Sequence, residues 1–386
     1  MSNSTLSFVR TTLEVEKEPP ASTVGVLGWV RKNLFSGWLN TALTLFALYL
    51  VWIIVPPILN FVFFDAIWTG EDGSYCRHQN NRGLIPDDTP IGACWAFVDA
   101  KFGQFIYGRY PADERWRVNI VFFMMAIGTI TLAIPSLPYK KWNAIFMLVI
   151  FPILAFFLLV GGYFGIAHVE TPLWGGLLVT LVVAITGIVV SLPLGVVFAL
   201  GRRSEMPVVR LVSIIFIEFW RGVPLITVLF MASVMLPLFL PEGVTFDKLM
   251  RVLIGVALFS AAYMAEVVRG GLQAIPKGQY EGAQALGLPY WKTMNLIILP
   301  QALKLVIPGI VNTFIGLYKD TTLVLIVGLF DLLGAIQLSF TDPKWSTPGT
   351  SHTGYVFAAI GFFIFCFSMS RYSIFMENRL HTGHKR

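Results

Sequence analysis

The chain has 386 residues, of which 56% are hydrophobic, only 13% are charged and 32 are phenylalanine. Its mean hydropathy is +0.71. A water-soluble domain cannot bury so much apolar surface, so the composition excludes that class and predicts a polytopic membrane protein. The formal net charge of +6 follows from the basic residues beside the spans and needs no nucleic-acid partner.

Residues 1–40 are polar and contain Ser, Thr and Pro, so we expect a loosely ordered cytoplasmic segment. The first apolar run begins after it and is longer than the roughly 7 to 15 residues of a signal-peptide core. We therefore expect this run to remain in the protein as a membrane anchor.

Eight apolar stretches reach or approach the ~18 residues that a spanning helix needs. They cover residues 42–64, 118–137, 144–166, 173–201, 224–240, 253–268, 302–327 and 355–373. The predicted fold class is an all-α polytopic membrane protein with about eight transmembrane helices. Three spans and a long loop (65–117) occupy residues 41–169. Five spans and a polar loop (269–300) occupy residues 170–376, before a tail at 377–386.

The basic residues predict the orientation of the spans, because short cytoplasmic loops are rich in Lys and Arg. With eight spans, they fall on one side of the membrane: Lys140, Lys141, Arg202, Arg203, Arg210, Arg269, Lys277, Lys292, Arg371, Arg379, Lys385 and Arg386. We expect that side to be cytoplasmic and both termini to lie there. The 65–117 loop then lies outside. It holds Cys76 and Cys94, which either form a disulfide or remain free thiols.

The sequence lacks the characteristic motifs of several enzyme classes. It has no G-x-x-x-x-G-K-[ST] phosphate cradle, no H-E-x-x-H zinc motif and no G-x-S-x-G nucleophile elbow. Its five histidines lack the spacing of metal ligands. We therefore expect no ATPase site, no metal site and no bound cofactor in this chain.

The polar loop between the sixth and seventh spans contains the helix-forming stretch "KGQYEGAQAL", Lys277 to Leu286. Gly287 follows at the position of a helix C-cap, and Pro289 ends the helix. The small residues Gly282, Ala283 and Ala285 permit close approach of another backbone. Such a helix either docks in a groove of a partner protein or lies on the membrane surface.

Charged residues interrupt the seventh span in "YKDTTL", where Lys319 and Asp320 precede Thr321. Ionisable groups at membrane depth usually line a pathway or pair with one another. Lys319 and Asp320, with Asn312 and Thr321 nearby, are therefore candidates for contacts with a zwitterionic substrate. The alternative is a structural pair between Lys319 and Asp320. The preceding "IPG" is expected to kink this helix.

The stretch 207–240 is too long for one simple span, so we expect an interfacial elbow that turns into the membrane near Gly222 and Pro224. Glu218 and Arg221 are three residues apart and are expected to pair across one helix face. Glu266 and Arg269, at the end of the sixth span, are expected to support the polar loop.

These motifs resemble those of the permease subunits of bacterial ABC importers. Their pattern E-A-A, three residues, G, nine residues, I-x-L-P is matched by Glu281, Gly282 in place of the first Ala, Ala283, Gly287, Ile297, Leu299 and Pro300. "EFWRGVPL", Glu218 to Leu225, is similar to a second signature of the polar amino acid branch. The three extra spans resemble the M-type permease subunit of the general L-amino acid transporter of Gram-negative bacteria.

The resemblance implies a five-helix type I ABC importer permease core with three extra N-terminal spans, in a bacterial inner membrane. It implies four kinds of partner: a second homologous permease, two copies of an ATPase that binds ATP and Mg, a periplasmic amino acid binding protein, and the bilayer. The helix in the polar loop would couple to the ATPase. The residues implied there are Gln279, Glu281, Gly282, Ala283, Ala285, Leu286 and Gly287, supported by Glu218, Arg221, Gly222, Pro224, Glu266, Arg269, Gly270, Leu299 and Pro300.

The sequence leaves two alternative functions and the role of the aromatic residues undecided. A self-contained secondary transporter could use Asp320 to couple an ion, but it would have no use for the polar helix. A membrane scaffold would need neither Lys319 nor Asp320. In the 65–117 loop, the aromatic residues Trp95, Phe97, Phe105, Tyr107 and Tyr110 either contact the binding protein or form a membrane-interface belt.

Overall fold

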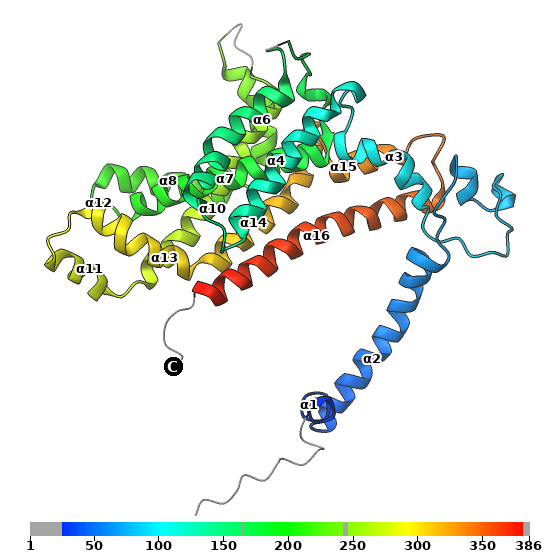
Figure 1. Ribbon diagram of the computed structural model, residues 1–386, viewed down its shortest axis with the longest axis horizontal. Helices are drawn as coiled ribbons and strands as arrows, with labels where there is room; N and C mark the ends of the chain where they lie inside the picture. The colour runs from blue at the N-terminus through cyan, green and yellow to red at the C-terminus, as the bar shows by residue number, and fades with distance from the viewer. Residues whose placement is uncertain (1–24, 164, 242–245, 381–386) are drawn as a thin grey trace, which may run out of the picture. The chain divides into compact units, whose positions relative to one another are not determined.

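The computed structural model describes residues 25–163, 165–241 and 246–380 (Figure 1). The predicted N-terminal segment up to residue 24 and the tail residues 381–386 lie outside this range. The chain divides into two compact units, Met1–Ala66 and Ile67–Arg386. In the described residues, two short strands, β1 (Gly175–Gly176) and β2 (Phe330–Asp331), pair in parallel, and the other regular elements are helices.

Seven helices in the described part of the chain are long and apolar enough to cross a membrane. They cover Trp38–Phe64, Ala112–Ala133, Lys140–Val160, Leu177–Arg202, Lys248–Ala274, Ile307–Val327 and Pro348–Leu380. An eighth span is formed if Pro207–Gly222 and Leu225–Phe239, which are bent by 102° at the break, count as one. The prediction of an all-α protein with about eight spans is confirmed, and so is the turn in the chain at residues 222–224.

The first unit contains α1 (Gly25–Asn33), α2 (Trp38–Leu59) and η1 (Asn60–Phe64). The α2 sequence is apolar on all sides, as expected of a span whose surface faces lipid or other spans. The hydroxyl of Thr44 in α2 donates to the carbonyl oxygen of Leu34 at 2.8 Å, which holds α2 to the turn after α1.

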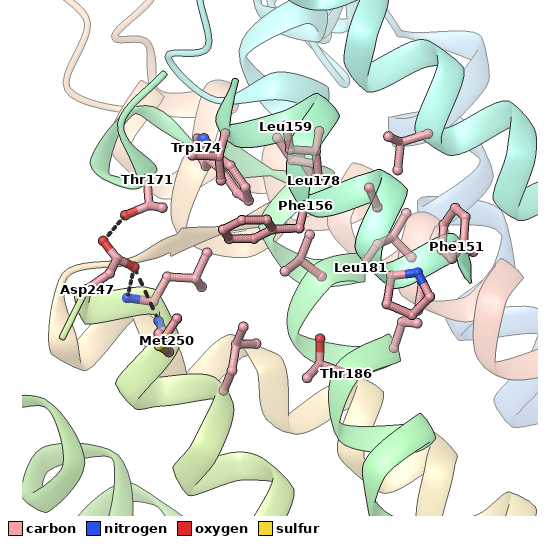
Figure 2. Close-up of a pocket in the computed structure, with 18 of the residues that line it drawn as sticks. Phe151, Phe156, Leu159, Thr171, Trp174, Leu178, Leu181, Thr186, Asp247 and Met250 are labelled. Atoms are coloured by element: carbon pink, nitrogen blue, oxygen red, sulfur yellow. Dashed lines mark hydrogen bonds between the residues drawn. The ribbon is translucent and has the colours of Figure 1, made fainter. Parts of the chain in front are cut away.

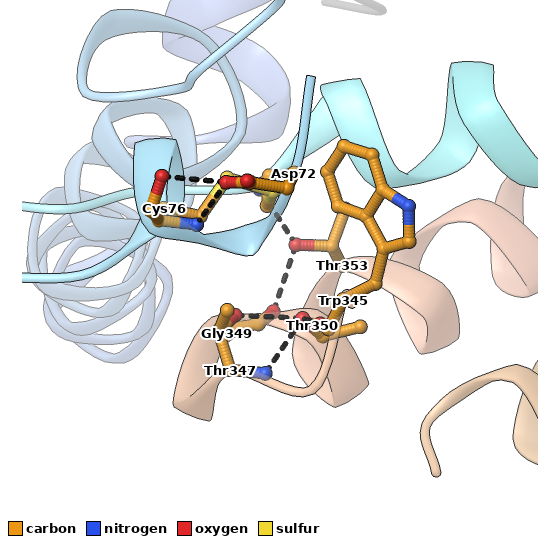
Figure 3. Close-up of a disulfide and its surroundings, with 9 residues drawn as sticks. Asp72, Cys76, Trp345, Thr347, Gly349, Thr350 and Thr353 are labelled. Atoms are coloured by element: carbon orange, nitrogen blue, oxygen red, sulfur yellow. Dashed lines mark hydrogen bonds between the residues drawn. A yellow bond between two sulfur atoms is a disulfide. The ribbon is translucent and has the colours of Figure 1, made fainter. Parts of the chain in front are cut away.

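One end of the second unit is built around a disulfide between Cys76 and Cys94, whose Cα atoms are 5.9 Å apart. We call it the disulfide end. The backbone N–H of Cys94 donates to the hydroxyl of Thr353 at 2.8 Å (Figure 3). Both half-cystines are buried with Trp345 and Ile336. The elements here are η2 (Gly73–Cys76), η3 (Gln79–Asn81), α3 (Trp95–Tyr107) and α15 (Leu332–Ser339).

Five aromatic residues were predicted either to contact a binding protein or to form a membrane-interface belt, and three of them are core residues instead. Phe97 and Phe105 are fully buried, and Tyr110 is 1% exposed. Phe97 and Phe105 pack against each other edge to face, and the hydroxyl of Tyr110 donates to the carbonyl oxygen of Leu159 at 2.9 Å. Because α3 docks on α15 and α16, Phe97 and Phe105 face inward and cannot serve a partner or a membrane belt, whereas Trp95 and Tyr107 remain partly exposed.

The second and third spans pack directly on the spans that follow them. They comprise η4 (Ala112–Glu114), α4 (Arg115–Ala133), α5 (Lys140–Ile145), η5 (Phe146–Ile150) and α6 (Phe151–Val160), and η6 (Thr171–Leu173) leads into α7 (Leu177–Arg202). Val118 of α4 and Leu159 of α6 share one buried cluster with Leu178 and Val183 of α7. The chain therefore shows continuous packing across residue 169, where the sequence suggested a boundary.

The remaining spans centre on α10 (Lys248–Ala274), which packs along α7 (Figure 1). Around them lie α8 (Pro207–Gly222), α9 (Leu225–Phe230), η7 (Met231–Met235), η8 (Leu236–Phe239), α11 (Lys277–Ala285), α12 (Tyr290–Thr293), η9 (Met294–Ile298), α13 (Leu299–Leu305), α14 (Ile307–Asp320), η10 (Thr321–Val327) and α16 (Pro348–Leu380). The predicted span 302–327 is broken at Val306, because Pro308 begins a new helix in the first turn of α14.

Candidate functional site

The polar helix predicted between the sixth and seventh spans is α11, Lys277–Ala285. Gly287 has a φ of +69°, the left-handed conformation that glycine adopts without strain. Its N–H donates to the carbonyl oxygen of Gln284 at 2.9 Å, and the N–H of Leu288 donates to that of Ala283 at 3.1 Å. These two bonds form a Schellman motif, so the helix ends where the sequence indicated.

One face of α11 is fixed to the rest of the chain. The guanidinium of Arg203, at the end of α7, donates to the hydroxyl of Tyr280 at 3.1 Å and lies over its ring. Gln279 accepts a hydrogen bond from the side chain of Gln301 at 3.1 Å. Arg203 and Tyr280 carry no motif in the sequence, and their contact depends on how α11 folds back on α10.

The opposite face of α11 is open to solvent. Glu281, Gly282, Ala285 and Gly287 are exposed, and Leu286 is 78% exposed. A Cβ atom added at Gly282 would meet no atom within 4 Å, so the glycine does not serve close packing within this chain. The small residues on this open face permit the backbone of another protein to approach closely, and Leu286 adds an apolar side chain beside them.

Ala283 differs from the prediction for this helix. It is only 2% exposed, so it faces the chain itself and cannot contact a partner. Tyr280 and Ala283 are three residues apart and therefore share one helix face, which is the inward one. The small side chain of Ala283 allows α11 to approach its own support, whereas Ala285 belongs to the open surface.

A charge network lies beside α11, at the end of the bundle opposite the disulfide. Its centre is Glu266 of α10, whose carboxylate contacts Arg269 at 2.7 Å, Arg202 at 2.9 Å and Arg221 at 3.6 Å. The Glu266 side chain is 16% exposed. The network joins α7, α8 and α10 at one level, which makes it a rigid support for the chain that leads into α11.

The predicted pair between Glu218 and Arg221 is wrong. Glu218 contacts Arg202 of α7 at 2.8 Å, and Arg221 contacts Glu266. Because α8 crosses both α7 and α10, its charged residues form ion pairs with residues of those helices and not with each other. Arg202, interpreted from the sequence only as an orientation signal, is therefore a main member of the network.

The other motif residues have distinct places. Gly222 ends α8, and Pro224 is the N-cap of α9, so together they form the 102° bend. Gly270 in α10 has open space beside it. Leu299 is 9% exposed in a buried cluster with Ala302, and Pro300 lies in the first turn of α13.

A second candidate site is the face of α14. Pro308, Asn312 and Lys319 are exposed, and a Cβ atom added at Gly316 would meet nothing within 4 Å. Their spacing of four, four and three residues places them on one side of the helix. Leu317 and Tyr318, on the other side, are buried. A spanning helix with an open face that includes Asn and Lys is typical of a helix that lines an aqueous pathway.

The residues predicted to line the pathway do not all lie on the open face of α14. Lys319 is exposed and Asp320 is half-buried, and the ion pairs of the described residues include none between them. Adjacent residues on a helix point in different directions, which explains why they do not pair. Thr321 is 1% exposed, and its hydroxyl donates to the carbonyl oxygen of Tyr318 at 2.8 Å. It therefore faces the chain, not a pathway.

An acidic residue that the sequence did not single out is fully buried at the disulfide end. Asp331 accepts hydrogen bonds from the backbone N–H groups of Gly334 at 2.9 Å and Leu333 at 3.2 Å, so it caps α15. Burial raises the pKa of this carboxyl to about 6, although the two backbone donors act in the opposite direction. Asp331 therefore supports the fold, and its side-chain hydrogen bonds within the described part of the chain go to Leu333 and Gly334, not to Lys319 or Asn312.

Comparisons with known proteins identify a matching family and similar proteins. Residues 191–381 match the protein family described as "Binding-protein-dependent transport system inner membrane component". The chain is 54% identical to the inner membrane amino-acid ABC transporter permease protein YhdY of Escherichia coli (strain K12), over 92% of this chain and 93% of that protein.

It is also 41% identical to the glutamate/glutamine/aspartate/asparagine transport system permease protein BztC of Rhodobacter capsulatus, over 98% of this chain and 99% of that protein. Among solved structures, it is similar to a crystal structure of an amino acid ABC transporter with histidines. That match has 28% identity and a TM-score of 0.47, and it covers 53% of this chain and 92% of that one.

Proposed function

Since this chain belongs to the family of binding-protein-dependent inner membrane components, the permeases of ABC transporters, we propose that it is one permease subunit of an ATP-driven amino acid importer. Relatives that match over nearly their whole length are named as amino acid permeases, which supports this substrate class. They also favour an ATP-driven importer over a self-contained secondary transporter that couples an ion at Asp320.

The main support for a coupling role of α11 is that one of its faces is fixed to the permease and the other is exposed. Tyr280 and Ala283 fix one face to the permease, while Glu281, Ala285 and Leu286 leave the other face free. We propose that this free face docks on a separate ATPase, which binds ATP and Mg. Rearrangement of the ATPase would then be transmitted through Arg203 and the Glu266 network to α7, α8 and α10.

The open face of α14 supports the second part of the proposal. Asn312 and Lys319 are at membrane depth, where exposure to lipid is unfavourable. A second, homologous permease that covers this face would enclose a polar pathway between the two chains. Lys319 and Asp320 would there meet the carboxylate and the ammonium group of an amino acid.

The remaining parts of the assembly follow from the family. A periplasmic binding protein would deliver the amino acid to the disulfide end, and ATP hydrolysis would belong to the separate chain. The basic residues support a cytoplasmic location for the end that carries α11, by the positive-inside rule. The protein would then lie in the bacterial inner membrane with both termini in the cytoplasm.

Co-purification with the ATPase encoded for the same transporter tests the proposal. The variants Glu281→Lys and Gly287→Asp should lose the ATPase, since one reverses a charge on the free face and the other strains the helix end. Glu71→Lys, at the disulfide end, should retain it. Retention of the ATPase by both α11 variants, with the membrane chain folded, would overturn the docking role of α11.

A further inference from the structure

A cavity of about 720 Å³ lies between the second and third spans and the core spans (Figure 2). Its walls come from α4, η5 and α6 on one side and from α7 and the start of α10 on the other. The wall residues are almost all apolar, among them Phe151, Phe156, Leu159, Leu178 and Leu181. None of the residues proposed for the pathway or for α11 lines it.

The depth of this cavity matches one leaflet of a bilayer. Leu178 and Val190, which both line it, are twelve residues apart on α7, about 18 Å along a helix. One leaflet of the hydrocarbon core is roughly 15 Å thick. Phe156 lines the cavity and is still 49% exposed, so this wall opens toward the surrounding lipid.

The mouth of the cavity, at the disulfide end, is polar and mainly acidic. Glu170 and Asp247 line it together with His168 and Thr171. Asp247 accepts a hydrogen bond from the hydroxyl of Thr171 at 2.6 Å and caps α10 through the N–H of Leu249 at 2.9 Å. These bonds keep the Asp247 carboxylate fixed at the mouth, as Figure 2 shows.

Two residues with N–H groups lie next to the mouth, Arg109 on the surface and Trp174 in the wall. Arg109 is exposed and donates at 2.9 Å to the carbonyl oxygen of Pro172, which lines the cavity, and no other side-chain hydrogen bond of Arg109 is seen among the described residues. Trp174 lines the cavity at 6% exposure, and its indole Nε1 has no hydrogen-bond partner among the described residues. The mouth therefore combines two carboxylates with a neighbouring exposed guanidinium, Arg109, that can donate to a phosphate oxygen.

We propose that this cavity binds a phospholipid with an ethanolamine headgroup. One acyl chain fills the apolar cavity, the ammonium group meets Glu170 and Asp247, and the phosphate meets Arg109. An anionic glycerol headgroup would face the two carboxylates without a cation of its own, and a choline headgroup has no N–H to donate. The lipid would fill the space between the second and third spans and the transport core, which gives these two spans a role in the assembly.

Native mass spectrometry of the delipidated full-length chain tests the proposal, with phosphatidylethanolamine, phosphatidylcholine and phosphatidylglycerol added in turn. The wild type should retain one phosphatidylethanolamine per chain, with about tenfold preference over phosphatidylcholine, the effect of one hydrogen bond to a charged group. Ala155→Phe, which fills the cavity, should abolish retention. Ile153→Phe is the matched control on the lipid-facing side of α6 and should retain the lipid.

Glu170→Gln separates the headgroup from the acyl chain. This variant should still bind lipid but should lose most of the preference for ethanolamine over choline. Equal retention of all three lipids by the wild type would overturn the headgroup assignment. Unchanged retention by Ala155→Phe, with thermal stability similar to that of Ile153→Phe, would overturn the cavity as the lipid site.

Discussion

Leu286 offers the sharpest test of how α11 meets the ATPase. Its side chain is 78% exposed at the end of the helix, and complete burial of a leucine side chain contributes about 1.5 to 3 kcal/mol. If docking buries this side chain, Leu286→Ala should weaken the complex by roughly 1 to 2 kcal/mol, or about five- to thirtyfold in Kd. The Schellman motif depends on backbone groups, so the helix itself should persist.

The assay is a titration of the permease, reconstituted in lipid nanodiscs, against fluorescently labelled ATPase. Leu84→Ala is the matched control, because Leu84 is 62% exposed in the loop at the disulfide end. The control should bind the ATPase as the wild type does. Wild-type affinity for Leu286→Ala, or equal losses for both variants, would refute the reasoning that the free face of α11 is the docking surface.

Four further predictions concern stability and transport. Glu266→Gln removes the common partner of three arginines and should lower the free energy of unfolding in detergent by about 1 to 3 kcal/mol. This loss is smaller than that expected for a fully buried ion pair, because the Glu266 side chain is partly exposed. Cys76→Ser should lower the melting temperature, and reduction with dithiothreitol should then have no further effect. Asp331 binds its proton more tightly in the folded state, so its stabilising contribution is complete below pH 3.8 and is lost as pH rises through about 6. Asp331→Asn keeps the helix cap but does not titrate, so the free energy of unfolding of the variant relative to the wild type should rise by up to roughly 3 kcal/mol between pH 3.8 and about 6. If this difference between variant and wild type does not change with pH, the raised pKa of the buried Asp331 carboxyl is contradicted. Lys319→Met should abolish uptake while the transporter still assembles, whereas normal uptake would exclude a role for Lys319 in the pathway.

The sequence was sufficient to predict features that depend on local chemistry. Hydropathy located the spans, because a bilayer selects long apolar helices whatever their neighbours are. Gly287 marked the end of α11, since the left-handed conformation at a helix end favours glycine. The pair Gly222 and Pro224 likewise indicated the bend between α8 and α9, which the structure gives as 102°.

Features that depend on how helices cross could not be predicted in the same way. Glu218 and Arg221 have the spacing of a helical pair, but α7 and α10 offer partners at closer range. Ala283 and Ala285 are chemically identical in the sequence, and only the contact of Tyr280 with Arg203 decides which of them faces inward. Phe97 and Phe105 of α3 are core residues for the same reason, because α3 docks on α15 and α16, which lie far along the chain.

The proposed transport is driven by ATP and coupled through α11. The most direct measurement is uptake of radiolabelled amino acid by liposomes that contain this chain, its partner permease and the ATPase, with the binding protein outside. We predict uptake that requires internal ATP, persists when ion gradients are collapsed and is lost in Glu281→Lys. Uptake by this chain without the ATPase, driven by a proton or sodium gradient, would contradict the account.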